Sequence, residues 1–164
     1  MHDLSLYLLE LLENSVRAGA TRVAVTLAVD RRADLLALTV EDDGPGLPVP
    51  PDAALDPFYT TKPGKKTGLG LSLLRQEAEA AGGGLSVSSS ERLGGTAVEA
   101  RMSLTNVDRP PAGDVALSIL TMTVTNPEVA FSVELREDGE LVVLGRETLP
   151  ARLDTLRAFQ RSLD

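Results

Sequence analysis

The sequence contains no cysteine, no long uncharged apolar run and no excess of basic residues. Without cysteine, disulfide bridges and thiolate chemistry are excluded. No apolar run approaches the roughly 18 residues that a membrane span needs, and the start MHDLSLYLLE has an acidic residue where a secretion signal has basic ones. These absences predict a cytoplasmic protein with no membrane association.

The charge balance is acidic, with 24 Asp and Glu residues against 16 Lys and Arg residues and a formal net charge of −8. Such a balance argues against binding to nucleic acid or to an anionic membrane. The lysines are a local exception, because Lys62, Lys65 and Lys66 are the only ones in the chain and lie within five residues. This cluster suggests an anion-binding loop, although a solvated loop would have the same composition.

The 164 residues are enough for one domain with its own core, or for one such domain and a small appendage. Hydrophobic periodicity and turn residues predict a helix at residues 3–18 and two strands at 21–30 and 34–43. They predict a long loop at 47–66, a second helix at 68–84 and a hairpin at 85–104. Gly19 is placed to end the first helix.

The last 51 residues form a smaller unit after the linker-like stretch NVDRPPAG. A helix is predicted from the capping residue Asp114 to Asn126, where Pro127 stops it, although TMTVT also alternates like a strand. A hairpin follows across Asp138-Gly139 and then a final helix. This unit has no chemical motif. Its role is either partner docking or dimerisation, or simple extension of the core.

A polar stripe runs along the Leu-rich first helix. At alternating steps of four and three residues it comprises Asp3, Tyr7, Glu10, Asn14 and Arg17. A helix that is apolar around most of its circumference is buried, so the stripe should face a wet cleft or other buried polar groups. A surface helix whose stripe meets solvent is the alternative.

Two glycine-containing segments suggest close approach of a ligand. The second strand ends in EDDGPG, where Gly44 and Gly46 follow the carboxylates, and KTGLGLSLL opens a helix with Gly68 and Gly70. Backbone N–H groups at a helix N-terminus favour an anion. The segment is not a Walker phosphate loop, because Lys66 stands where Ser or Thr is required.

The chain contains, in order, the segments ELLENSVRAGATRV, EDDGPG, DPFYTTK, TGLGLSLL and a final GGT strand. These five segments resemble the boxes of the GHKL ATPases. That superfamily contains DNA gyrase, heat-shock chaperone ATPases, histidine kinases and MutL-type mismatch-repair ATPases. The first box is most similar to the MutL type, and the third and fourth to histidine kinases. Lys66 departs from the family pattern, since many histidine kinases have glycine there.

The resemblance implies an α+β fold of the Bergerat type, a two-layer α/β sandwich in which a mixed sheet packs on helices, with a small C-terminal helix-hairpin-helix extension. It implies a GHKL ATP-binding domain at residues 1–104, a linker at 105–113 and a small α/β extension at 114–164.

The resemblance also implies binding of ATP with Mg²⁺. Asn14 would hold Mg²⁺ through its amide oxygen, a hard ligand of the kind that magnesium takes. Asp42 would accept a hydrogen bond from the adenine amine and so reject guanine, with support from Thr96. Gly44 and Gly46 would leave room for the base, and Phe58 and Tyr59 could hold a lid over it.

The implied phosphate-binding residues comprise the lysine cluster and the start of the second helix: Lys62, Lys65, Lys66, Thr67, Gly68, Leu69 and Gly70. Glu10 is the candidate catalytic base, because it lies one helical turn before Asn14 on the same face. Glu13 lies off the stripe and is expected to have a supporting or capping role.

The reaction is left open. Three functions fit these residues. The first is an ATPase that acts as a switch, and the second is a kinase that acts on a Ser or His of a separate partner in bacterial regulation, including the anti-sigma type of serine kinase. The third is an ATP-binding module without turnover. On one continuous helix the single histidine, His2, would lie about 18 Å from Asn14, which disfavours transfer to it in cis but leaves transfer within a dimer open. A separate partner protein, or a homodimer formed through the C-terminal unit, is expected.

Overall fold

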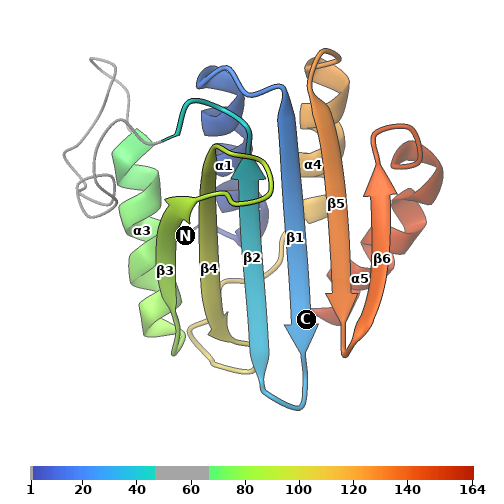
Figure 1. Cartoon of the computed structure of the whole chain (residues 1–164). Coiled ribbons are helices and arrows are strands. Elements are labelled where there is room, and N and C mark those ends of the chain that lie inside the picture. Colours follow the sequence, from blue (N-terminus) through green and yellow to red (C-terminus); the bar gives the residue numbers. More distant parts are fainter. Residues whose placement is uncertain (1, 47–66) are drawn as a thin grey trace.

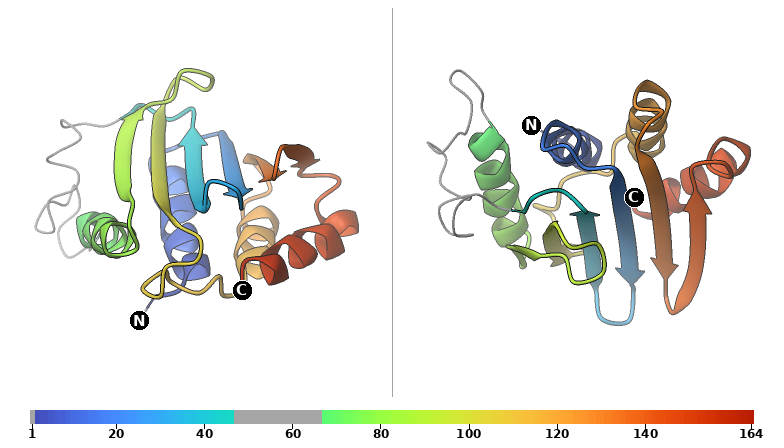
Figure 2. Two further views of the ribbon diagram at one scale, coloured as in Figure 1. Left: turned by 90° about the horizontal axis from the view of Figure 1, so that it is seen from below. Right: turned by 45° about the horizontal axis from the view of Figure 1, so that its top comes forward.

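A mixed sheet with helices on one face organises the chain (Figure 1, Figure 2). The structure, a computed structural model, describes residues 2–46 and 67–164. Within these residues the sheet has six strands in the order β3-β4-β2-β1-β5-β6. Seen from below in Figure 2, the helices lie together beneath the sheet, and its other face is open. The predicted two-layer α+β architecture is therefore confirmed.

The elements follow the predicted order. The helices are α1 (Leu4–Arg17), α3 (Thr67–Ala80), α4 (Val115–Thr125) and α5 (Leu153–Ser162), the last preceded by a 3₁₀ turn at Pro150–Arg152. The strands are β1 (Arg22–Asp30), β2 (Leu35–Asp42), β3 (Gly84–Ser89), β4 (Thr96–Ser103), β5 (Ala130–Glu137) and β6 (Glu140–Gly145).

Helix α1 packs most of its leucines into the core between the sheet and the other helices. Asp3 caps the helix by accepting a hydrogen bond from the backbone N–H of Leu6 at 3.0 Å, which satisfies one of the free N–H groups of the first turn. Leu8 and Leu12 are fully buried in the core. Gly19 ends the helix in the left-handed region, with φ of 90°.

The hairpin β5-β6 turns at the predicted Asp138-Gly139. Both residues have positive φ, 51° and 92°, as a two-residue type I′ turn requires. The hairpin β3-β4 also pairs antiparallel as predicted.

The C-terminal residues 114–164 extend the same sheet. Strand β5 pairs in parallel with β1, and β6 pairs antiparallel with β5. Helix α4, capped by Asp114 as predicted, packs beside α1, where the Ser118 hydroxyl donates to the carbonyl of Ser5 at 2.9 Å. The predicted helix-hairpin-helix thus lies against the edge strand β1 of the first part of the sheet.

In the described residues, no helix has the length and apolar character needed to cross a membrane.

Candidate functional site

Asp42, at the end of β2, faces the helical layer. It lies on the same face of the strand as the buried Leu38 and Val40, and only 6% of the residue is exposed. The hydroxyl of Ser15 in α1 donates to its Oδ2 at 2.7 Å. A buried carboxylate needs such partners, because desolvation without them is costly.

Two backbone amides bind the other oxygen of Asp42. The N–H groups of Gly44 and Thr96 donate to Oδ1 at 3.0 and 3.1 Å. The N–H of Gly95 donates to the Asp42 carbonyl at 3.0 Å. A Cβ at Gly95 would stand 2.6 Å from the Gly44 nitrogen, so only glycine fits here. The structure thus brings together three of the predicted adenine-site positions, Asp42, Gly44 and Thr96.

The loop after β2 begins with a second, structural carboxylate. Asp43 accepts hydrogen bonds from the Thr21 hydroxyl and from the amides of Thr21 and Arg22, at 2.6 to 2.9 Å. These hydrogen bonds, above all that of the Thr21 hydroxyl, lower the pKa of Asp43. The predicted Gly46 follows with φ of 86°, a conformation that favours glycine.

Glu10 lies between His2 and the start of α3. Its Oε1 is 3.3 Å from His2 Nε2, and the two side chains are 42% and 38% exposed. Its Oε2 lies so close to Gly70 that a Cβ there would overlap it. The candidate base and the predicted phosphate-binding turn are therefore neighbours.

Tyr7, one turn before Glu10, is buried between α1 and α3. Burial, together with the nearby carboxylates of Glu77 and Glu10, raises the pKa of the Tyr7 phenol, which hydrogen bonds to Glu77. The Oε2 atom of Glu77 is buried and has no hydrogen-bond partner in the described part of the chain. The polar stripe thus meets buried polar groups at this point, one of the two situations expected for it.

Asn14, the predicted magnesium ligand, lies half-buried near the end of α1. Its Oδ1 accepts a hydrogen bond from Arg17 Nη2 at 3.2 Å. An amide oxygen has two lone pairs, so Oδ1 keeps one position for a cation. Glu13 points to solvent and pairs with Arg17 at 3.7 Å.

Five predicted site residues lie outside the described part of the chain: Phe58, Tyr59, Lys62, Lys65 and Lys66. The other predicted phosphate-binding residues, Thr67 to Gly70, form the first turn of α3.

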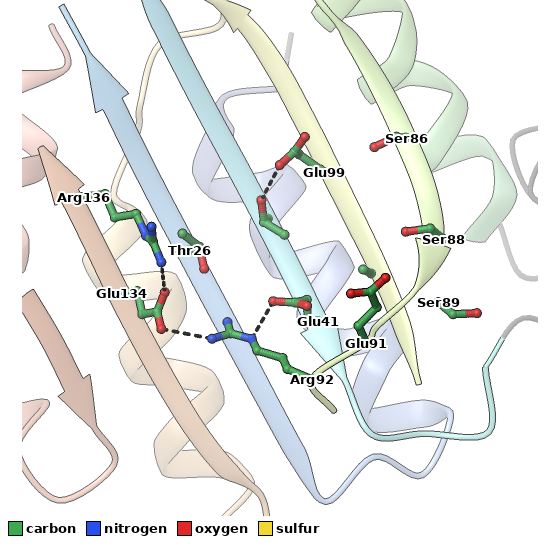
Figure 3. Close-up of a pocket in the computed structure, with 12 residues that line it drawn as sticks. Thr26, Glu41, Ser86, Ser88, Ser89, Glu91, Arg92, Glu99, Glu134 and Arg136 are labelled. Carbon is green, nitrogen blue, oxygen red and sulfur yellow. Dashed lines mark hydrogen bonds and ion pairs between the residues drawn. The ribbon is translucent and has the colours of Figure 1, made fainter. Parts of the chain in front are cut away.

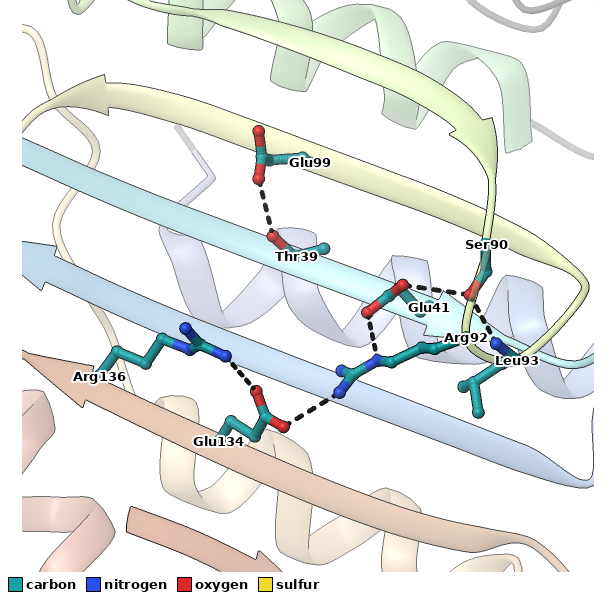
Figure 4. Close-up of polar contacts among 8 residues, drawn as sticks. All are labelled: Thr39, Glu41, Ser90, Arg92, Leu93, Glu99, Glu134 and Arg136. Carbon is teal, nitrogen blue, oxygen red and sulfur yellow. Dashed lines mark hydrogen bonds and ion pairs between the residues drawn. The ribbon is translucent and has the colours of Figure 1, made fainter. Parts of the chain in front are cut away.

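The open face of the sheet carries a separate polar hollow of about 510 Å³ (Figure 3). Arg92 bridges Glu41 at 2.8 Å and Glu134 at 3.0 Å, and Arg136 pairs with Glu134 (Figure 4). Burial alone would raise the pKa of Glu134, but its hydrogen bonds from the two arginines outweigh burial and lower it. Since Glu41 and Asp42 point to opposite faces of β2, this hollow is distinct from the Asp42 site.

Two contributors to the site, Ser15 and Gly95, were not expected from the sequence, and His2 was considered there only as a phosphate acceptor. Ser15 follows Leu8 and Leu12 on the core-facing side of α1, where a buried hydroxyl signals a polar partner. His2 was considered only through its distance from Asn14 along a continuous helix. In the structure α1 begins at Leu4, and His2, in front of it, contacts Glu10.

Comparison with known proteins gives a consistent family assignment. Residues 2–106 match the model of the family described as histidine kinase-, DNA gyrase B-, and HSP90-like ATPase. The sensor histidine kinase AruS of Pseudomonas aeruginosa is 34% identical over 160 residues, which cover 88% of this chain and 16% of AruS. The sensor protein kinase PilS of the same organism is 40% identical over 84 residues, 48% of this chain and 16% of PilS.

A third relative, the sensor protein ChvG of Agrobacterium fabrum, is 42% identical over 67 residues, 37% of this chain and 11% of ChvG. The matched regions thus span only 11% to 16% of these relatives. Among solved structures, the MutL ATPase domain of Aquifex aeolicus complexed with ADP is 20% identical, with a TM-score of 0.48, and the match covers 96% of this chain and 70% of that one.

Proposed function

We propose that this chain, which belongs to the family of histidine kinase-, DNA gyrase B- and HSP90-like ATPases, binds ATP with Mg²⁺ between α1, the end of β2 and the start of α3, and activates its γ-phosphate. An ATP-binding domain of this kinase and ATPase class accounts for residues 2–106. The observation that carries the proposal is the buried Asp42 carboxylate, which is held by Ser15, Gly44 and Thr96.

Asp42 is the proposed adenine-recognition residue. An ionised carboxylate offers about four lone-pair positions, and the three hydrogen bonds to Asp42 leave about one of them on Oδ2. The exocyclic amine of adenine is a donor that fits this position. Guanine presents a carbonyl oxygen there, which would leave the buried acceptor unpaired and is therefore rejected.

The phosphates are proposed to lie at the first turn of α3, since the first N–H groups of a helix have no partner within it and the helix dipole favours negative charge there. Lys62, Lys65 and Lys66 immediately precede this turn in the sequence and remain proposed phosphate ligands. They would offset the repulsion that an acidic chain exerts on a polyanion. Phe58 and Tyr59 remain proposed lid residues.

Asn14 is the proposed protein ligand of Mg²⁺. Its neutral amide oxygen suits this cation, which prefers hard oxygen ligands and usually keeps several of its waters. When bound, Mg²⁺ would neutralise phosphate charge and polarise the γ-phosphoryl group.

Glu10 is the proposed general base. It lies one turn before Asn14 on the same helix, and its carboxylate points at Gly70 in the turn assigned to the phosphates. From this position it would take the proton of a water molecule or of a hydroxyl on a partner protein. Sequence similarity to the sensor kinases AruS and PilS supports transfer to a partner in bacterial regulation, with hydrolysis as the reaction in its absence.

The test follows the γ-phosphate of labelled ATP in the wild type, in Glu10→Gln and in the control Glu79→Gln, whose exposed side chain lies near the C-terminal end of α3, away from its first turn. Phosphate release, ATP binding and labelling of added partner proteins are measured together. The proposal expects Glu10→Gln to bind ATP but to lose turnover, and Glu79→Gln to keep both. Equal turnover in all three proteins would remove Glu10 from the mechanism, and absence of ATP binding would refute the proposal.

A further inference from the structure

We infer that His2 is a positioning residue that holds the Glu10 carboxylate toward the first turn of α3. The inference rests on the proposed function, in which Glu10 is the base. It starts from the 3.3 Å approach of His2 Nε2 to Glu10 Oε1. At this distance a protonated imidazole forms an ion pair with the carboxylate, and a neutral ring with its proton on Nε2 still presents a polar N–H beside Oε1.

The His2 ring is itself held in place. It stacks on Tyr7, with ring centroids 5.1 Å apart and planes at 27°. Tyr7 is only 1% exposed, and its hydroxyl hydrogen bonds to Glu77 of α3. The ring therefore rests on a buried aromatic surface that α1 and α3 share.

The backbone after His2 is also fixed. Asp3 caps α1, and the N–H groups of Leu4 and Ser5 donate to the carbonyls of Pro111 and Ala112 at 2.9 and 3.0 Å. The segment that precedes α4 thus holds the start of α1. With both backbone and ring restrained, the imidazole has one principal direction, toward Glu10.

The contact with His2 restricts the conformational freedom of Glu10. A glutamate side chain has three rotatable bonds, and that of Glu10 is 42% exposed. His2 holds Oε1, which directs Oε2 to Gly70. Because a displacement of about 1 Å from reacting geometry can cost up to a hundredfold in rate, loss of this restraint should lower turnover without changing the groups that bind ATP.

The titratable groups that face His2 in the described residues are Glu10 and Tyr7 on α1 and, beyond Tyr7, Glu77 on α3. Of the residues that the structure describes, only Glu10 is within ion-pair distance of the imidazole. The effect of His2 should therefore pass through Glu10 alone.

The test compares His2→Phe, which keeps a ring on Tyr7 but removes the donor, with His2→Gln, which keeps an N–H donor on a side chain of similar length. Turnover number, KM for ATP, ATP affinity and melting temperature are measured for each. We expect kcat to fall about tenfold in His2→Phe, KM and affinity to stay within about twofold, and His2→Gln to recover part of the loss. In a Glu10→Gln background His2→Phe should have no further effect, because both changes act on one group.

Wild-type kcat in His2→Phe would overturn the inference and leave the proposed function intact. A fall in ATP affinity or melting temperature in parallel with kcat would also overturn it, since His2 would then act only on the fold. A wild type that neither releases nor transfers phosphate would overturn the proposed function, and the positioning role with it.

Discussion

Replacing Asp42 by asparagine should remove most of the affinity for ATP and leave the fold intact. In the folded protein Oδ1 accepts the amides of Gly44 and Thr96, and Oδ2 accepts the Ser15 hydroxyl. Asparagine keeps an acceptor at the first position. At the second it places an amide N–H₂, which the Ser15 hydroxyl can turn to accept. The internal hydrogen bonds therefore survive.

Adenine recognition does not survive the same change, because the amide N–H₂ would face the adenine amine with a donor in place of an acceptor. A hydrogen bond to a charged acceptor contributes about 1.5–3 kcal/mol. Its loss corresponds to a weakening of about tenfold to 150-fold in Kd. The facing donors add to this loss, so the upper part of the range is expected.

Isothermal titration with a non-hydrolysable ATP analogue and Mg²⁺ measures the change, and thermal melting verifies the fold. Ser15→Ala is the matched control, since it removes one internal hydrogen bond and keeps the carboxylate. We expect a smaller loss of affinity in the control. If Asp42→Asn binds the analogue within about twofold of the wild type at an unchanged melting temperature, adenine recognition by Asp42 is wrong.

Three further substitutions test the structure around the site. Gly95→Ala should lower the free energy of unfolding in urea by about 1–3 kcal/mol, because its Cβ would meet backbone at 2.6 Å. Gly84→Ala should change it little, because a Cβ there meets no described residue within 4 Å apart from its chain neighbours. Equal costs would refute the packing argument. Hydrogen bonds, chiefly from the Thr21 hydroxyl, lower the pKa of Asp43 in the folded state. Its carboxylate therefore stabilises the fold above the ordinary pKa of about 4, and this stabilisation is lost as pH falls below that value. Asp43→Asn should flatten the dependence of the urea midpoint on pH in this acidic range, and an unchanged slope would contradict the assignment. Burial, and after it the neighbouring carboxylates, raise the pKa of Tyr7. The stability of the fold should therefore fall above about pH 10, where tyrosine ionises in the unfolded chain. Tyr7→Phe should reduce this fall, as measured by melting curves across that pH range.

Local features of the sequence predicted most of the fold. The leucine spacing and the glycine at its end defined α1, Asp114 capped α4, and Asp138-Gly139 formed the expected hairpin turn. Each of these depends on neighbouring residues only. The parallel pairing of β5 with β1 joins residues more than a hundred positions apart, and no local pattern carries that information.

The same limit applies to the site. Asp42, Gly44 and Thr96 were predicted because their local motifs resemble the GHKL boxes, and the structure adds the contacts that join them. Ser15 was missed because its partner Asp42 is 27 residues away. The contact of His2 with Glu10 was not predicted, because His2 precedes the helical pattern and that pattern carries no information on where its side chain lies.

The most direct test of the central claim is a titration of the ¹⁵N-labelled protein with Mg²⁺ and a non-hydrolysable ATP analogue, followed by the amide resonances. The account predicts large shifts at Gly44, Gly70 and Thr96, on the helical side of the sheet, and small ones at Ser88 and Glu99 in the hollow of the open face (Figure 3). Shifts confined to the open face, or no shifts at all, would contradict an ATP site built around Asp42.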